Sequence, residues 1–341
     1  MENNLTILVL LKGREEYTER FVEYFIKSKL KYKLFFADGD KKPISKKILN
    51  KLKKCNVDFQ YQKFEFDINY RKFINKIYRA LNLIKTKYVM LFDNDDFPQK
   101  YSINKCLLKL KNSKDIIGCG GYLINFNLFN FQNKKNYLSG NAINLSKINF
   151  GSNFNNSSSI KRLNAFLLKK KNINTVNDIF RTNILKKNYK ILKNLKFDYI
   201  FFYFLVADIL NYYTGKIYKI KLPFIIHQHH PHGLSVKMKN IYETTGNKNF
   251  LKQKKIVYKV LGQELKNKKI NILLDKYFSE IDKKSQIYKL KFKKLKKNDR
   301  INILNKTGEF LKLNYQILKN KYLKYDNSHI TKFLKTFKNK K

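Results

Sequence analysis

Two short acidic runs and one histidine run are the parts of this chain best suited to chemistry. The acidic runs are residues 38–40 (DGD) and 93–96 (DNDD), and each follows an apolar segment. Carboxylates two residues apart just past a strand can point the same way and share one hard cation. A cation held by only one or two carboxylates keeps free positions that suit phosphate oxygens. The acidic runs therefore predict a metal-assisted site for a phosphorylated ligand.

A simpler interpretation of residues 93–96 is a helix N-cap ahead of Phe97 and Pro98, a role that suits Asp96. Capping alone leaves the other acids of this run unexplained in so basic a chain. The glycine-rich phosphate motifs GxGxxG after a strand and GxxxxGK[ST] are absent from the sequence. We therefore expect phosphate binding to depend on a metal ion rather than on a glycine loop.

The elements that must position these residues alternate in hydrophobic period over the first 125 residues. Such alternation predicts right-handed βαβ units and a mostly parallel sheet flanked by helices. In an open parallel sheet, the ligand lies beyond the carboxyl ends of the strands, where both acidic runs fall. The expected strands are 5–11, 33–37, 57–62, 88–92 and 115–124, and the expected helices are 15–29, 44–53, 69–84 and 98–110.

The remainder of the chain is less regular. Residues 125–159 lose their periodicity and predict a partly ordered insert near a site. Helices are expected at 181–192 and 198–213, a strand at 216–226, and lysine-rich helices after residue 246.

The formal net charge of +48 tempts one to predict a nucleic-acid-binding protein. However, 66 of the 73 basic residues are lysines, whereas nucleic-acid readers favour arginine. The abundant Lys, Asn, Ile, Phe and Tyr all have A/T-rich codons, so a nucleotide bias explains the charge. Three scattered cysteines fit a reducing cytosol. No segment has the pattern of a signal peptide or a transmembrane span, so membrane association is expected to be peripheral.

Three segments, taken in order, resemble the nucleotide-binding half of family 2-like glycosyltransferases of the GT-A fold. Residues 6–25 match the first strand and loop, and 33–40 match a second strand ending in Asp-Gly. Residues 69–122 match a long helix followed by a strand, a DxD-type motif, a proline and a helix. The resemblance covers 5–125 well and 175–235 loosely. It implies an α/β nucleotide-diphospho-sugar transferase fold, here with a helical C-terminal extension.

The resemblance also implies roles for individual residues. Asp38 would contact the base or ribose of a nucleotide-sugar, and Arg14 would also touch the nucleotide. Asp93 and Asp95 would hold Mn²⁺ or Mg²⁺ against the diphosphate, with Asp93 counted among the nucleotide-binding residues too.

The histidine run HQHHPHG follows a predicted strand and contains four of the five histidines. Many GT-A enzymes take one more metal or diphosphate ligand from the region after their last core strand. Neutral imidazole is a good metal ligand, so we assign His230 to the metal site. A zinc site is disfavoured because no cysteine pair lies nearby, and a solvated loop without a role remains the alternative. The other members are His227, His229 and His232.

The resemblance places the general base in the second half, near a helix start, where it deprotonates the acceptor hydroxyl. Segments 177–182 (NDIFRT) and 196–217 resemble later segments of the family. The acidic candidates are Asp178, Asp198 and Asp208. We favour Asp208, because it is the only acid of an otherwise apolar helix, where burial raises a carboxyl pKa. A buried acid paired with lysine is the alternative for Asp208, and an N-cap is the alternative for Asp198.

We therefore predict a nucleotide-sugar-dependent glycosyltransferase, inverting and metal-dependent, that serves cell-surface polysaccharide or glycan synthesis. Residues 1–125 would bind the nucleotide-sugar and metal, 126–240 the glycan or lipid-linked acceptor, and 241–341 would be a lysine-rich helical region. The alternatives are another GT-A-like nucleotidyl enzyme and a non-enzymatic basic nucleic-acid binder. The expected location is the cytoplasm, with peripheral contact to the inner membrane face. Residues 241–341 carry 28 basic and 8 acidic side chains, and segment 288–297 suggests attraction to anionic lipid.

Overall fold

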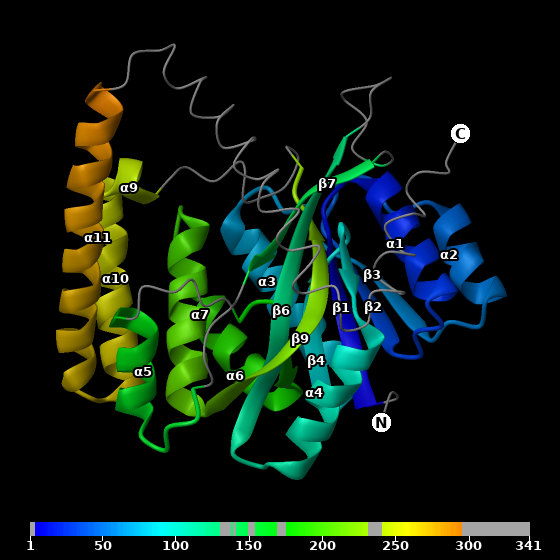
Figure 1. Cartoon of the computed structure of the whole chain (residues 1–341), viewed down its shortest axis with the longest axis horizontal. Coiled ribbons are helices and arrows are strands. Elements are labelled where there is room, and N and C mark those ends of the chain that lie inside the picture. The colour runs from blue at the N-terminus through cyan, green and yellow to red at the C-terminus, as the bar shows by residue number, and fades with distance from the viewer. Residues whose placement is uncertain are drawn as a thin grey trace.

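A computed structural model describes residues 4–129, 138, 141–148, 154–168, 175–230 and 241–294. Nine strands of these residues form one sheet, in the order β3-β2-β1-β4-β8-β6-β9-β5, with β7 paired to β6. Helices cover both faces of the sheet (Figure 1). The strands are β1 (Leu5–Leu11), β2 (Lys33–Asp38), β3 (Phe59–Lys63), β4 (Tyr88–Asp93), β5 (Asp96–Pro98), β6 (Ile116–Phe129), β7 (Asn141–Ile148), β8 (Ile179–Arg181) and β9 (Lys216–Gln228). The helices are α1 (Glu15–Lys27), α2 (Lys46–Lys54), α3 (Tyr70–Leu83), α4 (Lys100–Asn112), α5 (Ser159–Leu168), α6 (Thr182–Leu192), α7 (Ile200–Thr214), α9 (Ile241–Thr244), α10 (Lys248–Leu265) and α11 (Lys269–Lys294).

The first four strands of the sheet are parallel and follow the predicted βαβ order. β1 pairs with β2 on one side and with β4 on the other, and β3 extends the sheet beyond β2. Every residue of β1 is buried, as a strand covered on both faces requires. Because the chain turns from β1 toward β2 and later returns to β4, the strand order reverses between β1 and β4. That reversal opens a crevice at the carboxyl ends of these two strands.

The other half of the sheet is mixed. β8 runs antiparallel to both β4 and β6, whereas β9 runs parallel to β6. The short β5, which begins at Asp96, the last acid of this run, runs antiparallel to the end of β9. The carboxyl ends of β4, β6 and β9 therefore lie at the same edge of the sheet as the crevice.

The predicted insert at residues 125–159 is wrong where the structure describes it. β6 continues to Phe129, β7 pairs with it, and α5 begins at Ser159. Phe126 and Leu128 are buried, and the polar Asn127 between them is partly exposed, so the alternation of a half-buried strand is present. The many asparagines of this segment hid that pattern.

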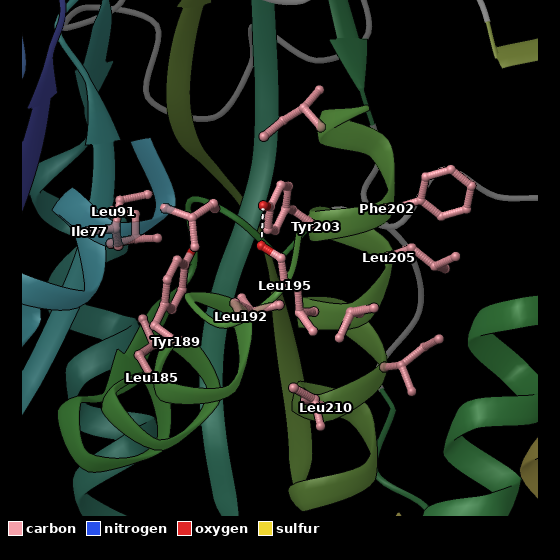
Figure 2. Close-up of a cluster of buried hydrophobic side chains, with 14 of the residues drawn as sticks. Ile77, Leu91, Leu185, Tyr189, Leu192, Leu195, Phe202, Tyr203, Leu205 and Leu210 are labelled. Carbon is pink, nitrogen blue, oxygen red and sulfur yellow. Dashed lines mark hydrogen bonds between the residues drawn. The ribbon is translucent and has the colours of Figure 1, made fainter. Parts of the chain in front are cut away.

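Two hydrophobic cores hold the helices to the two faces. α1, α2 and α4 cover one face, and α3, α5, α6, α7, α10 and α11 cover the other. Figure 2 shows part of the second core, where Tyr203 of α7 donates a hydrogen bond of 2.8 Å to the Leu195 carbonyl. This face has more helices because α10 and α11 extend the layer beyond α7 (Figure 1).

The predicted lysine-rich C-terminal helices are present as α9, α10 and α11. No helix within the described residues is both long and apolar enough to cross a membrane. Segment 288–297, for which we predicted lipid attraction, lies partly outside the described residues, as does the chain after residue 294.

Candidate active site

The acids after β4 lie at the switch in strand order and are fixed to the first helix. We call Asp93, Asp95 and Asp96 the β4 acid cluster. Asn94, within this run, donates hydrogen bonds from Nδ2 to Thr18 Oγ1 at 2.8 Å and to the Arg14 carbonyl at 3.2 Å. The loop after β4 is therefore fastened to the loop after β1, across the crevice. Sequence reasoning missed Asn94, although its place inside an acidic run was a signal.

Asp95 receives two cationic or polar partners from distant segments. Gly13 and Arg14 both have positive φ angles, 69° and 62°, a tight turn that glycine makes at no steric cost. Arg14 Nη1 then lies 2.6 Å from Oδ2 of Asp95. His230 Nε2 lies 2.6 Å from the same oxygen. The predicted Arg14, Asp95 and His230 are thus brought together, whereas Oδ1 of Asp95 has no hydrogen-bond partner among the described residues.

The histidine run reaches the acids because β5 pairs with β9. Asp96 stands opposite His227 in this pairing, and His227 Nδ1 lies 2.6 Å from Oδ1 of Asp96. His230, three residues further, is buried and stacks on Tyr17 of α1 with ring centroids 4.6 Å apart. His232 lies outside the described residues. The N-cap interpretation of Asp96 is wrong: Asp96 belongs to β5, and α4 starts only at Lys100 with Gln99 before it.

The electrostatics of the β4 acid cluster are uneven. Burial, followed by the negative charges of Asp95 and Asp96, raises the pKa of Asp93 to about 7. Burial also raises the pKa of Asp96. Burial acts the same way on Asp95, but the His230 hydrogen bond and the Arg14 charge outweigh it and lower the Asp95 pKa. Burial lowers the pKa of His227, but its ion pair with Asp96 reverses this and raises the value to about 9.

The residues of this cluster fit a divalent cation in two respects. Oδ1 of Asp95 is a buried carboxylate oxygen without a partner among the described residues, and such an atom favours a ligand. The raised pKa of Asp93 comes partly from like charges, which a cation would relieve. Within the described residues, no three His, Cys, Asp or Glu side chains form a ready-made metal site.

Asp38 lies at the end of β2 with its carboxylate turned inward. Oδ1 accepts a hydrogen bond from the Asp40 backbone N–H at 2.9 Å. Oδ2 accepts from the Ile44 N–H at 3.2 Å and from the Tyr61 hydroxyl at 2.7 Å. Asp38 thus shapes the loop after β2, as aspartates do in turns. Its contact with a nucleotide stays a prediction.

A buried ion pair behind Gly39 was missed from the sequence. Lys76 of α3 lies 2.5 Å from Oδ2 of Asp67 and donates to the Leu11 carbonyl at 2.8 Å. A Cβ on Gly39 would overlap the Asp67 carboxylate, so the close approach requires glycine. This pair joins the ends of β1 and β2 to α3, and the glycine of DGD was its only signal.

Asp178 lies just before β8 and forms a buried ion pair with Lys219 of β9. Lys219 Nζ is 2.6 Å from both Asp178 carboxylate oxygens, and both residues are buried. Since Ile179 pairs with Met90, Asp178 falls next to the carboxyl end of β4. Ideal strand spacing separates its Cα from that of Asp93 by about 8 Å. Asp178 therefore lies at the same edge as the β4 acid cluster.

Asp208 lies in the middle of α7 and faces the turn that precedes β8. Thr175 donates its hydroxyl to Oδ1 of Asp208, and Asn211 Nδ2 donates to Thr175 Oγ1 at 3.2 Å. The Thr175 carbonyl in turn accepts the Asp178 N–H at 3.0 Å. Burial raises the pKa of Asp208 to about 7. Asp208 thus contacts the turn that carries Asp178.

Asp198 is exposed and lies apart from both groups. Its Oδ2 accepts from Asn249 Nδ2 at 2.9 Å and from Gln253 Nε2 at 3.3 Å. It lines a pocket of about 390 Å³ at the start of α7, together with aromatic side chains of α3, α7 and α10. The capping alternative is not its role, because α7 has Tyr199 at its N-cap, without a side-chain capping bond.

The sequence pattern of the family described as glycosyl transferase family 2 matches residues 6–186. This chain belongs to glycosyl transferase family 2. Membership confirms the predicted enzyme class, and the sheet with its flanking and C-terminal helices confirms the predicted GT-A-like α/β fold. The matched segment includes β1 to β4, the β4 acid cluster and Asp178.

Solved structures similar to this family member include TarS of S. aureus. One TarS structure is 15% identical with a TM-score of 0.44, and the match covers 76% of this chain and 40% of TarS. A structure of TarS residues 1–349 in complex with UDP-GlcNAc is 11% identical with a TM-score of 0.47, over 76% of this chain and 66% of that one. This chain therefore spans less than half the length of the longer TarS structure. No curated protein sequence matches it.

Proposed function

We propose that this family 2 protein transfers a sugar from a nucleotide-sugar donor to an acceptor hydroxyl, with inversion at the anomeric carbon. The observation that carries the proposal is the convergence of Arg14, Asp95 and His230 at the switch in strand order. Positive charge at this crevice, from a cationic side chain or from a metal ion held by a carboxylate, suits the binding of a diphosphate. Membership of the family supplies the reaction class.

Asp93 and Asp95 are the carboxylates proposed to hold Mn²⁺ or Mg²⁺. The described residues hold no ready-made three-ligand site, so His230 would become a further ligand only on giving up its contact with Asp95. Such a cation stabilises the negative charge that develops on a leaving nucleoside diphosphate. Arg14 supplies a further positive charge beside it. Arg14 and His230 both contact Asp95, so we expect them to exchange this contact for the incoming ligand.

Among the three candidate acids, we propose Asp178 as the general base. It lies at the edge of the sheet that carries the β4 acid cluster, and on the same face as Leu91 and Phe180. Asp208 lies one layer away, beneath the turn, and Asp198 lies at the start of α7. An acid near the donor's anomeric carbon is required, because the base must reach a hydroxyl in hydrogen-bond contact.

The proposed step has a simple balance. The acceptor oxygen forms a bond to the anomeric carbon while the bond from that carbon to the diphosphate oxygen breaks. The acceptor's proton passes to the Asp178 carboxylate, which retains lone pairs beyond those that face Lys219. The nucleoside diphosphate leaves on the opposite side, next to Arg14, Asp93 and Asp95.

Thermal stabilisation by nucleoside diphosphates, with and without Mn²⁺, tests the proposal. A ligand at one hundred times its dissociation constant stabilises the folded state by about 2.7 kcal/mol. We expect a rise in Tm with at least one nucleoside diphosphate and Mn²⁺ together, and hydrolysis or transfer of the matching nucleotide-sugar. Release of pyrophosphate from a nucleoside triphosphate and a sugar phosphate would instead indicate a nucleotidyl enzyme.

The cellular setting is also a proposal. We propose a glycan or lipid-linked acceptor, cell-surface polysaccharide or glycan synthesis as the setting, and a cytoplasmic protein that touches the inner membrane face. The support is the lysine content of α10 and α11, where the exposed Leu251, Ile272 and Leu290 lie among lysines. Each lysine near an anionic surface contributes about 1 kcal/mol of attraction. Cosedimentation that is equal with neutral and anionic liposomes would overturn this part alone.

A further inference from the structure

Lys219 contacts the acid that we propose as the base and reaches it from two strands away. Gly120 of β6 pairs with Lys219 on β9. On the other side of β6, Cys119 pairs with Ile179, so Gly120 faces Asp178. Two neighbouring strand spacings make a gap of about 10 Å. The lysine side chain must therefore cross above Gly120 to meet the carboxylate.

Gly120 makes this crossing possible. A Cβ at this position would overlap Oδ1 of Asp178, so any other residue would displace the carboxylate. The Nζ atom contacts both oxygens at 2.6 Å, and the two side chains are 4% and 5% exposed. A carboxylate held at both oxygens in a buried site has one orientation. An exposed aspartate, in contrast, samples several rotamers.

Other titratable groups surround the pair. Among them are carboxyl, thiol and phenol groups, which carry no positive charge that could take the place of the lysine. Asp208 of α7 feels both charges of the pair: the Asp178 charge raises the pKa of Asp208, and the Lys219 charge lowers it. Cys106 of α4 and Tyr212 of α7 feel the Asp178 charge, and burial raises the pKa of both. Cys119 of β6 lies beside Cys106. Burial raises the pKa of Asp178 itself, and the Lys219 charge opposes that rise.

We propose that Lys219 is a positioning residue that keeps the Asp178 carboxylate ionised and aimed from the gap above Gly120. This proposal rests on the assignment of Asp178 as the base. Lys219 would act on the proton-transfer step, because its Nζ atom contacts both carboxylate oxygens of the proposed base. Turnover should therefore depend on Lys219, whereas donor binding should not.

The pH profile of kcat for Lys219→Met tests the proposal. Loss of the cation leaves a buried carboxyl without its partner, so its pKa rises, by about one to three units for such a pair. We expect the acid limb of the profile to move up by at least about one pH unit, with kcat at pH 7 reduced about tenfold or more and the donor KM unchanged. Lys219→Arg keeps the charge and should return the acid limb toward the wild-type position. Should K219M not fold, Lys219→Gln is measured by the same criteria.

The matched control is Lys216→Met on the same strand. It breaks the exposed ion pair of Lys216 with Asp115 and should leave both kcat and the acid limb unchanged. A folded K219M or K219Q with the wild-type acid limb and turnover would overturn the proposal and leave Lys219 a structural residue. Asp178→Asn tests the assignment of Asp178 as the base separately from the role of Lys219. If that variant keeps full turnover, the base assignment is wrong. If it is inactive while K219M is normal, only the role of Lys219 is wrong.

Discussion

Two groups of buried or half-buried charges lie at the same edge of the sheet, and they are built in different ways. In the β4 acid cluster, Asp95 contacts Arg14 and His230, and Asp96 contacts His227; these partners come from loops and a strand end. Asp178 is neutralised by Lys219, which comes from the interior of the sheet. The first group keeps an unsatisfied oxygen on Asp95 within the described part of the chain. In the second, both carboxylate oxygens are bound.

Under the proposed assignments, this difference separates donor binding from proton transfer. A cluster with loop-borne partners and an open oxygen can exchange its contacts for a cation and a diphosphate. A carboxylate held across a glycine gap cannot move far, which is what a base needs if it must meet one hydroxyl in one geometry. Breaking either group should therefore give a different kinetic signature.

The largest effect is expected from Asp178→Asn. The substitution removes the proton acceptor and, by proposal, lowers turnover by about two to four orders of magnitude, the usual range for loss of a general base. Steady-state kinetics with the matching donor and acceptor measure the loss of kcat. The donor KM should change less than about threefold, because the substitution removes an interaction of the transition state and not of donor binding. Loss of donor affinity with unchanged kcat would instead assign Asp178 to donor binding. The proposed difference in role between Asp178 and the β4 acid cluster would then be wrong.

The next effect is expected from Asp95→Asn. An uncharged amide is a poor ligand for a hard cation, so Mn²⁺-dependent affinity for a nucleoside diphosphate should fall at least about tenfold, the scale for disrupted metal sites. Calorimetric titration with and without Mn²⁺ measures it. Asp58→Asn, which removes an exposed acid, is the control and should bind as the wild type does. Unchanged affinity in the Asp95 variant would remove the metal from the proposal.

The parallel half of the fold was predictable, because each of its elements has its own period. β1 was predicted at its observed bounds, and α3 and β4 within one residue. Local pattern also indicated the acids after β4, since a buried strand that ends in carboxylates is rare. Family resemblance then supplied their roles, which stay predictions.

The contacts that complete the site were less predictable, because they depend on pairing across the sheet. β5 has only three residues, which are too few to show a hydrophobic pattern in the sequence. Its pairing with β9 nevertheless brings His227 to Asp96. Lys219 looked like one of many lysines in a basic chain. Only the register of β8, β6 and β9 shows that it faces Asp178 across Gly120. We favoured Asp208 because its apolar helix predicted burial. Burial does not single it out in the structure, where Asp95, Asp96 and Asp178 are buried as well.

The smallest effect, and the sharpest test of the comparison, is expected from Asp208→Asn. The Asp208 pKa is raised from 3.8 to about 7 by burial, so the folded protein keeps this proton over a range in which the unfolded chain releases it. Stability from this group is fully present below about pH 4, is lost as the pH rises to about 7, and then stays constant. Asparagine remains neutral, so the variant should lack this part of the slope. Between pH 5 and pH 8 its Tm should fall less than that of the wild type, by about 2–4 °C for each kcal/mol involved.

The control and the kinetic readout decide what Asp208 does. Asp115→Asn, at an exposed acid whose pKa is lowered by the Lys216 hydrogen bond, should not flatten the slope. Turnover of the Asp208 variant should stay within about threefold of the wild type, because the amide can still accept from Thr175 and hold the turn. A loss of two orders of magnitude at unchanged Tm would move the base to Asp208. The buried pair of Asp178 and Lys219 would then be the structural element, and the two acids would exchange their roles.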